Sequence, residues 1–327
     1  MIRNPQEMPA LTMQLAMSTW TLAAIGAVLE SGLVEHLREA RSVDDLAARC
    51  PTLSRARIER CLAVAATAGV VASEGGQYRL AEGAMCFSQP PMRASLQGDV
   101  RSQLMQALAF LDSSAGKGPS AGWSHSDPTL LQAQGDGSAG IAGPFKTMIA
   151  PMLGDLPERL GRPGARFLDV GAGVASLSIA MCRGWPALRV VGLDASETPL
   201  AAARQNVERA GLADRIELRR LAVEELRDEE SFDLAWLPSM FIPAAALPTG
   251  AARVRASLRP GGWVLFPIGG FAGEERARAV FALVNELWGG PVLAVAEAES
   301  LLKEAGFSTV RALPGPPWAP PLLAAQR

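Results

Sequence analysis

The chain has 327 residues, of which 49% are hydrophobic, and its formal net charge is −2. That length predicts two domains with a sizeable core, and the near-neutral charge excludes a general electrostatic attraction to nucleic acid or acidic lipid. The four cysteines are scattered and only two histidines are present. We therefore predict free thiols in a reducing cytoplasm and no metal site.

Residues 8–29 carry no charge, and the stretch is long enough to raise the question of a membrane span. Pro9, Gln14 and the polar run at 18–21 dilute its hydrophobicity. We therefore predict no membrane span but a buried helix, whose apolar side carries Leu11, Leu15, Leu22, Ile25 and Leu29.

A helix, helix, hairpin pattern follows. Ser42 and Ser54 stand where N-caps would begin two short helices. Glu74-Gly75-Gly76 separates two short strand-like runs and predicts a β-hairpin. This order is that of a winged helix, which raises the question of DNA binding through Arg55, Arg57 and Arg60. Acidic neighbours and the net charge argue against it, so we predict no nucleic-acid partner.

Residues 112–143 are rich in Gly, Ser, Ala and Asp and hold His125. Such a composition favours a connection that is partly loop. We therefore predict a domain over 1–110 and a second over 111–327, with 111–160 as a linker and a helix that precedes the main sheet.

The stretch 166–173 (RFLDVGAG) predicts a short buried strand that ends in a turn with Gly171 and Gly173. Small and apolar residues then predict a helix. Asp194 ends the next predicted strand, about 20 residues after the first glycine, where a carboxylate can hold ribose hydroxyls. Strand, glycine turn, helix and acid predict a nucleotide-binding βαβ unit.

Two details separate the possible ligands. A dinucleotide fingerprint has a third glycine where this chain has Ser176. Asp169, just before the turn, would repel a pyrophosphate and attract an ammonium or sulfonium group. A cationic nucleoside is therefore the better prediction, with an NAD(P)-dependent oxidoreductase as an alternative.

Four segments, FLDVGAG, VVGLDAS, FDLAWL and LRPGGWVLF, resemble in order and spacing those of class I S-adenosylmethionine-dependent methyltransferases. Residues 166–327 carry this resemblance. It implies a Rossmann-like, seven-stranded, mostly parallel sheet with an antiparallel last strand, and S-adenosyl-L-methionine as cofactor.

The N-terminal half resembles the winged-helix dimerisation domain of small-molecule O-methyltransferases from plants and bacterial secondary metabolism. That resemblance implies a homodimer in which the first helix intertwines with a second subunit. A winged-helix, ligand-sensing transcriptional regulator remains an alternative.

The resemblance also implies roles for particular residues. Asp169 would face the methionine part of the cofactor, and the two glycines would permit close approach of the main chain. Asp194 would hold the ribose, and its neighbour Ala195 would also contact the cofactor. Residues at later strand ends would complete the cofactor site: Ala222, Val223 and Leu237.

The resemblance implies that the helix after the linker lines the substrate pocket, and large apolar residues at the end of the predicted strand 232–237 and after it suggest a methyl acceptor that is small and apolar, or aromatic. The predicted acceptor-lining residues are Phe145, Met148, Trp236, Met240 and Phe241.

The loop at 238–243 has no His, Asp or Glu, whereas plant members of the family carry a catalytic His there. Two possibilities follow. His125 reaches the pocket and acts as the base, or the acceptor is already nucleophilic and positioning suffices for O- or N-methylation.

Overall fold

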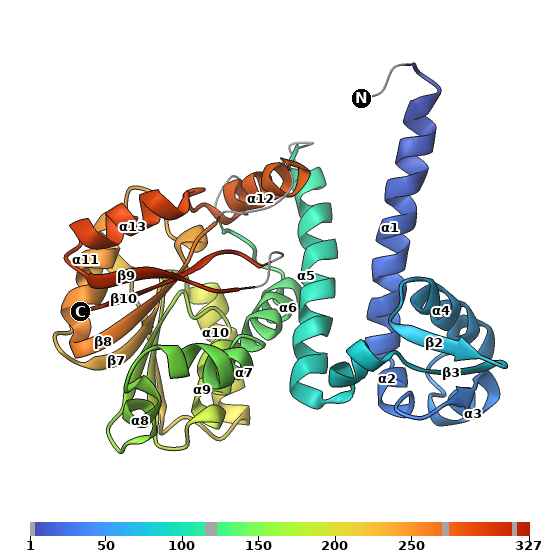
Figure 1. Ribbon diagram of the computed structural model, residues 1–327, viewed down its shortest axis with the longest axis horizontal. Coiled ribbons are helices and arrows are strands. Elements are labelled where there is room, and N and C mark those ends of the chain that lie inside the picture. The colour runs from blue at the N-terminus through green and yellow to red at the C-terminus, as the bar shows by residue number, and fades with distance from the viewer. Residues whose placement is uncertain (1–3, 115–122, 270–274, 316–318) are drawn as a thin grey trace. The chain divides into compact units, whose positions relative to one another are not determined.

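The computed structural model describes residues 4–114, 123–269, 275–315 and 319–327. The chain folds as two compact units, Met1–Leu108 and Ala109–Arg327 (Figure 1).

The first unit combines short helices with a small antiparallel sheet of order β1-β3-β2. Its helices are α1 (Glu7–Glu30), α2 (Leu33–His36), α3 (Val43–Arg49) and α4 (Arg55–Thr67), and its strands are β1 (Arg41–Ser42), β2 (Val71–Glu74) and β3 (Gln77–Leu80). A 3-10 turn, η1 (Glu82–Ser88), precedes α5 (Pro90–Ser114), which crosses the boundary between the units and was not predicted from the sequence.

Both predicted helix caps are confirmed. The Ser42 hydroxyl accepts the backbone N–H of Asp45, and the Ser54 hydroxyl accepts that of Arg57. Each bond satisfies an N–H group that has no partner inside its helix. The helices pack around fully buried residues that include Leu33, Leu46, Ile58 and Leu62.

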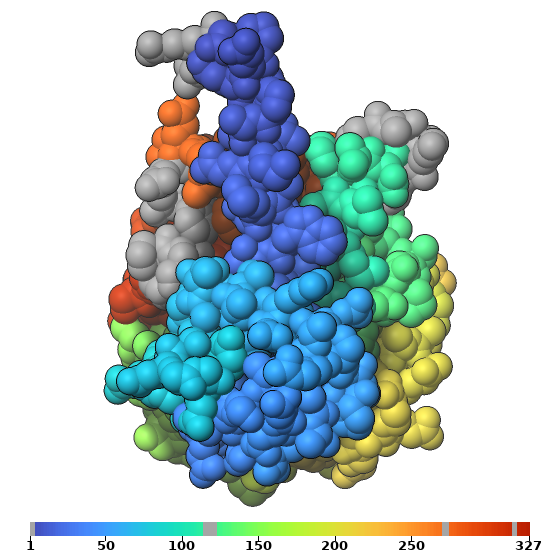
Figure 2. Space-filling model, turned by 90° about the vertical axis from the view of Figure 1, so that its right-hand side faces the viewer, coloured from blue at the N-terminus to red at the C-terminus, as the bar shows by residue number. Residues whose placement is uncertain are grey.

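The prediction that the first helix is buried is wrong for most of its length in a single chain. Leu11 and Leu15 are 38% and 41% exposed, and Trp20 is 75% exposed. Only the last turns of α1 reach the core, through Val28 and Leu29. Figure 2 shows α1 rising above the helices and hairpin of its own unit. The 24-residue α1 contains an 18-residue window with a mean hydropathy of 1.3, so by length and composition alone it is a candidate membrane span.

The second unit is built on the seven-stranded sheet that the sequence predicted. Its strand order is β6-β5-β4-β7-β8-β10-β9, and β10 runs antiparallel to both of its neighbours. The strands are β4 (Arg166–Val170), β5 (Arg189–Asp194), β6 (Ile216–Arg220), β7 (Phe232–Trp236), β8 (Leu258–Pro267), β9 (Ser308–Leu313) and β10 (Leu322–Gln326).

Helices cover both faces of this sheet (Figure 1). Along β4, Phe167 packs on one face, whereas Leu168 and Val170 pack on the other, as the two-residue period of a strand requires. The first face is covered by α8 (Leu156–Gly161), α9 (Ser176–Gly184) and α10 (Glu197–Arg209), and the second by α11 (Leu247–Ser257) and α13 (Val295–Glu304).

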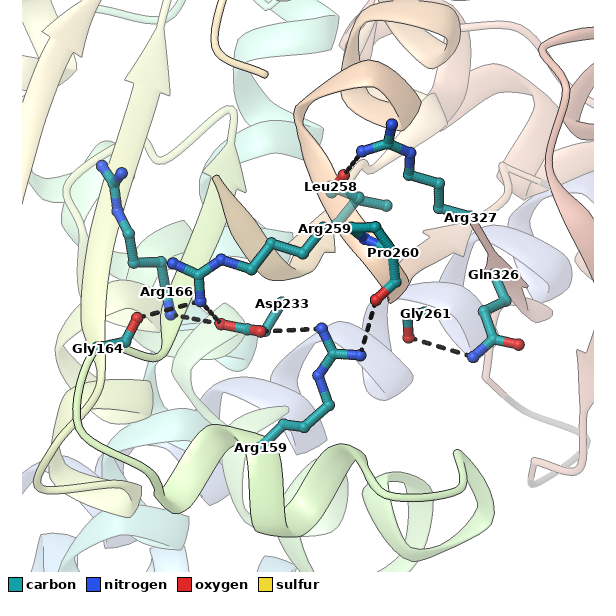
Figure 3. A network of polar contacts seen from close by, with 10 residues as sticks. All are labelled: Arg159, Gly164, Arg166, Asp233, Leu258, Arg259, Pro260, Gly261, Gln326 and Arg327. Carbon is teal, nitrogen blue, oxygen red and sulfur yellow. Dashed lines mark hydrogen bonds and ion pairs between the residues drawn. The ribbon is translucent and has the colours of Figure 1, made fainter. Parts of the chain in front are cut away.

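The amino ends of β4, β7 and β8 are joined by Asp233, whose side chain is 7% exposed (Figure 3). Its carboxylate accepts from Arg159 Nη2 at 3.0 Å, from Arg259 Nη1 at 2.7 Å and from the backbone N–H of Arg166 at 3.0 Å. A Cβ at Gly262 would lie 2.9 Å from the Arg259 carbonyl oxygen, so this turn requires glycine. The LRPGG segment therefore has a structural role at the amino ends of the strands. Open α/β sheets bind their ligands at the other end, outside the carboxyl ends of the strands.

Candidate active site

A cavity of about 720 Å³ lies at the carboxyl ends of β4, β5, β6 and β7. Open α/β sheets bind their ligands in this position. Its lining includes most of the residues predicted from the sequence: Asp169, Gly171, Gly173, Asp194, Ala195, Ala222, Val223, Trp236 and Phe241.

The backbone of the turn after β4 lines the cavity. Gly171 and Gly173 have φ angles of +71° and +56°, in the left-handed region that favours glycine. The N–H of Ala172, between them, donates to the carbonyl oxygen of Leu193 at 2.8 Å and so ties the turn to the end of β5. A ligand can therefore approach the main chain closely here.

Asp194 is held by two backbone donors. Its Oδ2 accepts the N–H of Gly173 at 3.0 Å, and its Oδ1 accepts the N–H of Ser196 at 2.8 Å. Burial raises the pKa of this carboxyl, and the two hydrogen bonds oppose the shift. Each carboxylate oxygen retains acceptor capacity, so the oriented pair can bind two neighbouring hydroxyls.

Asp169 lies on the same face of the sheet as α9, and only 2% of the residue is exposed. The Ser178 hydroxyl donates to its Oδ2 at 2.6 Å. Burial raises the pKa of Asp169 to about 7, with a smaller contribution from the charge of Asp194, while the hydrogen bond from Ser178 opposes the shift. A buried carboxylate of this kind favours a cationic partner.

One wall of the cavity comes from α6 (Pro128–Ala139), which the sequence analysis treated as part of a connection. The Ser176 hydroxyl donates to Asp136 Oδ1 at 3.3 Å and Gln132 Nε2 donates to the same atom at 2.7 Å, which ties α6 to α9. A Cβ at Gly135 would lie 2.3 Å from Val174 Cγ2. The Gly-Asp-Gly sequence is therefore a packing surface, although it resembles a turn. Asp127 and Pro128, which cap and begin the helix, are the local signal for it.

Aromatic side chains form the other end of the cavity. Trp123 and Phe241 meet edge to face at 5.4 Å, and Phe241 stacks on Trp288 at 4.8 Å with 27° between the rings. All three line the cavity together with Trp236, and we call these four residues the aromatic wall. Trp288 ends α12 (Glu275–Trp288). Trp123 and Trp288 lie far apart in the chain and were not predicted from the sequence.

His125 is not among the described cavity-lining residues. Its ring lies 4.8 Å from that of Trp123, edge to face, so the imidazole contacts the aromatic wall. Burial lowers the pKa of His125, which favours the neutral form. A neutral imidazole in this place can accept a proton if Trp123 leaves it access to the cavity.

Besides His125, four predicted residues are absent from the described lining of the cavity. Phe145 is 1% exposed because its ring packs on Trp185 at 5.5 Å under α9, and Met148 is 68% exposed. Met240 and Leu237 are buried at 6% and 0% exposure. Leu237 instead extends the sheet by donating its N–H to the carbonyl oxygen of Leu265.

The comparisons with known proteins agree with this geometry. Residues 167–262 match the model of a family described as a methyltransferase domain. A ubiquinone biosynthesis O-methyltransferase from Hahella chejuensis is 36% identical over 116 residues, which are 34% of this chain and 46% of that protein. A release factor glutamine methyltransferase from Gloeobacter violaceus is 33% identical over 92 residues, 28% of this chain and 32% of that protein. The chain thus spans less than half the length of these curated relatives.

Solved structures resemble almost the whole chain at low sequence identity. A provisionally assigned O-methyltransferase from Nostoc punctiforme has a TM-score of 0.68 and 20% identity, covering 98% of this chain and 99% of that one. CalO1, a methyltransferase in calicheamicin biosynthesis, has a TM-score of 0.62 and 18% identity, covering 99% of each chain. Human N-acetylserotonin methyltransferase has a TM-score of 0.61 and 16% identity, covering 100% and 99%.

The sheet order, the glycine turn with its two carboxylates and the family match point to one conclusion. Residues 167–262 match a methyltransferase domain, and the second unit that contains them has the fold of the solved methyltransferases compared above.

Proposed function

We propose that this chain transfers the methyl group of its cofactor, S-adenosyl-L-methionine, to a small, apolar or aromatic acceptor of the secondary-metabolite type. The observation that carries the proposal is the cavity itself. It brings Asp169, Asp194 and the glycine turn together with the aromatic wall in one space of about 720 Å³. Mostly apolar pockets with a few fixed polar groups are typical of small-molecule sites.

The chain's own residues would bind the cofactor and the acceptor, orient them and exclude water from the cavity. Asp194, oriented by two backbone donors, would hold the ribose hydroxyls, and Asp169 would attract the positive charge of the cofactor. The aromatic wall would keep a planar acceptor in one orientation and shield it from water. The cofactor, when bound, supplies an electrophilic methyl carbon, so the protein contributes chiefly proximity and orientation.

His125 would give at most weak base assistance, because its ring contacts Trp123 and is not among the described residues that line the cavity. We expect His125→Ala to lower kcat about tenfold, less than the 10²–10⁴-fold of a fully engaged base. The dissociation constant of the cofactor should stay unchanged. His36→Ala, in the first unit, is the matched control. Full activity of the His125 variant would mean that positioning alone suffices.

Cofactor affinity should depend on the protonation of Asp169. Because the folded-state pKa is raised to about 7, the carboxylate is neutral below that pH and charged above it. We expect the cofactor to bind about tenfold more weakly at pH 6 than at pH 8, since the charged fraction changes by that factor. Calorimetry across this range is the measurement. Asp169→Asn should bind weakly at every pH, and a wild-type profile that is flat would contradict the assignment.

We infer that the first unit is a winged helix that joins two copies of the chain through α1. Apolar residues of α1 are exposed in a single chain, and Trp20 is 75% exposed. Such a surface supports the proposal that a second copy of the chain buries it. The mass in solution tests this: a monomer in detergent-free buffer would refute it. The described cysteines are free thiols, which supports a cytoplasmic location.

We also infer that this unit does not bind DNA. Arg55 on α4 pairs with Asp44 and Glu59, so its charge is already compensated. Non-specific phosphate binding needs a more basic surface.

The decisive experiment incubates the full chain with isotopically labelled S-adenosyl-L-methionine and a library of aromatic metabolites, and detects labelled products by mass spectrometry. Transfer to a small aromatic compound supports the proposal. A cofactor that binds without any transfer would favour a ligand-sensing regulator, and binding of NAD(P) in its place would favour an oxidoreductase.

A further inference from the structure

The charge of the cavity bears on the class of acceptor. Among the described residues that line it, the ionisable ones are all acidic: Asp169, Asp194, Glu224 and Glu286. Two of these are accounted for by the cofactor, and Glu224 follows β6 on the cofactor side of the cavity. Glu286 has no place in the cofactor site.

Glu286 belongs to the last turn of α12, beside the aromatic wall. Trp288, two residues further on, stacks on Phe241 at 4.8 Å, and the following Gly289 and Gly290 also line the cavity. The N–H of Gly290 donates to the carbonyl oxygen of Met240 at 3.0 Å, which fixes this helix end against the loop that carries Phe241. Glu286 is itself exposed and so lies at the mouth of the cavity.

Three features of this place favour a positive charge. Within the described part of the chain, the Glu286 carboxylate has no hydrogen bond or ion pair. The carboxyl end of α12 carries the negative end of the helix dipole, and its last turn holds no basic residue to compensate it. The faces of Trp288 and Phe241 attract cations as well.

We propose that Glu286 is a specificity-determining residue that binds a protonated amine of the acceptor, so that this enzyme takes aromatic amines and rejects aromatic carboxylates and phosphates. This inference rests on the proposed methyl transfer. The ring would lie against the aromatic wall, and the ammonium group would lie at the mouth between Glu286 and the end of α12. An anionic acceptor would meet like charge there and no basic partner among the described lining residues.

The test measures binding of matched probes to the full chain saturated with S-adenosyl-L-homocysteine. Tryptamine, tryptophol and indole-3-propionate share one ring and differ in an ammonium, a hydroxyl or a carboxylate; naphthalene analogues with the same three groups form a second series. We expect at least one amine to bind about tenfold more tightly than its alcohol, and its carboxylate to bind more weakly still.

Glu286→Gln should remove the preference of amine over alcohol without changing the affinity for the alcohol or for S-adenosyl-L-homocysteine. Glu275→Gln, in the first turn of the same helix, is the matched control and should change nothing. Equal binding of amine and alcohol, tighter binding of the carboxylate, or no binding of any amine would overturn the proposal. If the wild-type chain does not bind S-adenosyl-L-homocysteine, the proposed function itself is refuted. Failure of the Glu286 proposal and failure of the proposed function therefore give different results.

Discussion

Replacing Asp194 with Ala should raise the dissociation constant of S-adenosyl-L-methionine at least about tenfold. The variant loses a carboxylate that can form charge-assisted hydrogen bonds with the ribose hydroxyls. It also loses the partner of the Gly173 N–H, so the glycine turn is no longer tied to the end of β5 through this side chain. Isothermal calorimetry on purified protein gives the result directly.

The same variant should lose little stability. Burial raises the pKa of Asp194, which means that its negative charge is unfavourable in the folded protein. We therefore expect a melting temperature close to that of the wild type, which separates loss of binding from loss of fold. Asp214→Ala, an exposed change in the loop after α10, serves as a control for cofactor affinity. Unchanged affinity in Asp194→Ala would refute the ribose assignment.

Replacing Asp233 with Ala should give the largest loss of stability, on the order of 3 kcal/mol in the free energy of unfolding. The change leaves Arg159 and Arg259, with side chains 14% and 35% exposed, without their shared carboxylate. It also removes the acceptor of the Arg166 backbone N–H at the start of β4. Denaturant unfolding, with the slope as a check on two-state behaviour, measures the effect.

The matched variant is Asp233→Asn, which retains the shape and one acceptor oxygen. We expect it to lose less stability than Asp233→Ala, because the backbone bond to Arg166 can persist. Cofactor affinity should be unchanged in both, since Asp233 lies at the amino ends of the strands and the cavity at their carboxyl ends. A loss below about 1 kcal/mol for the alanine variant would show that the two arginines find water or other partners at no cost.

The sheet could be predicted from the sequence because its signals are local. Strand β4, the two glycines of its turn and the acid at the end of β5 each follow from residue type and spacing within one βαβ unit. Helix α6 could not be predicted in the same way. Gly135 lies in the middle of this helix, although glycine has a low helix propensity. Only glycine allows the helix to approach Val174 so closely at this position.

The aromatic wall of the cavity was predicted only in part. Trp236 and Phe241 belong to one strand and the loop after it, where the sequence places them together. Trp123 and Trp288 come from opposite ends of the second unit, and only the folded chain brings them to Phe241. Phe145 and Met148 were misplaced because helical spacing does not tell which side of a helix meets the core and which meets a ligand.

The Asp233 network and the cavity stand at opposite edges of one sheet. Substitutions in the loops at the carboxyl ends of the strands should therefore leave unchanged the folding free energy that the network at the amino ends contributes. We therefore expect laboratory evolution directed at the cavity residues Trp123, Phe241 and Glu286 to retain the stability that the Asp233 network supplies.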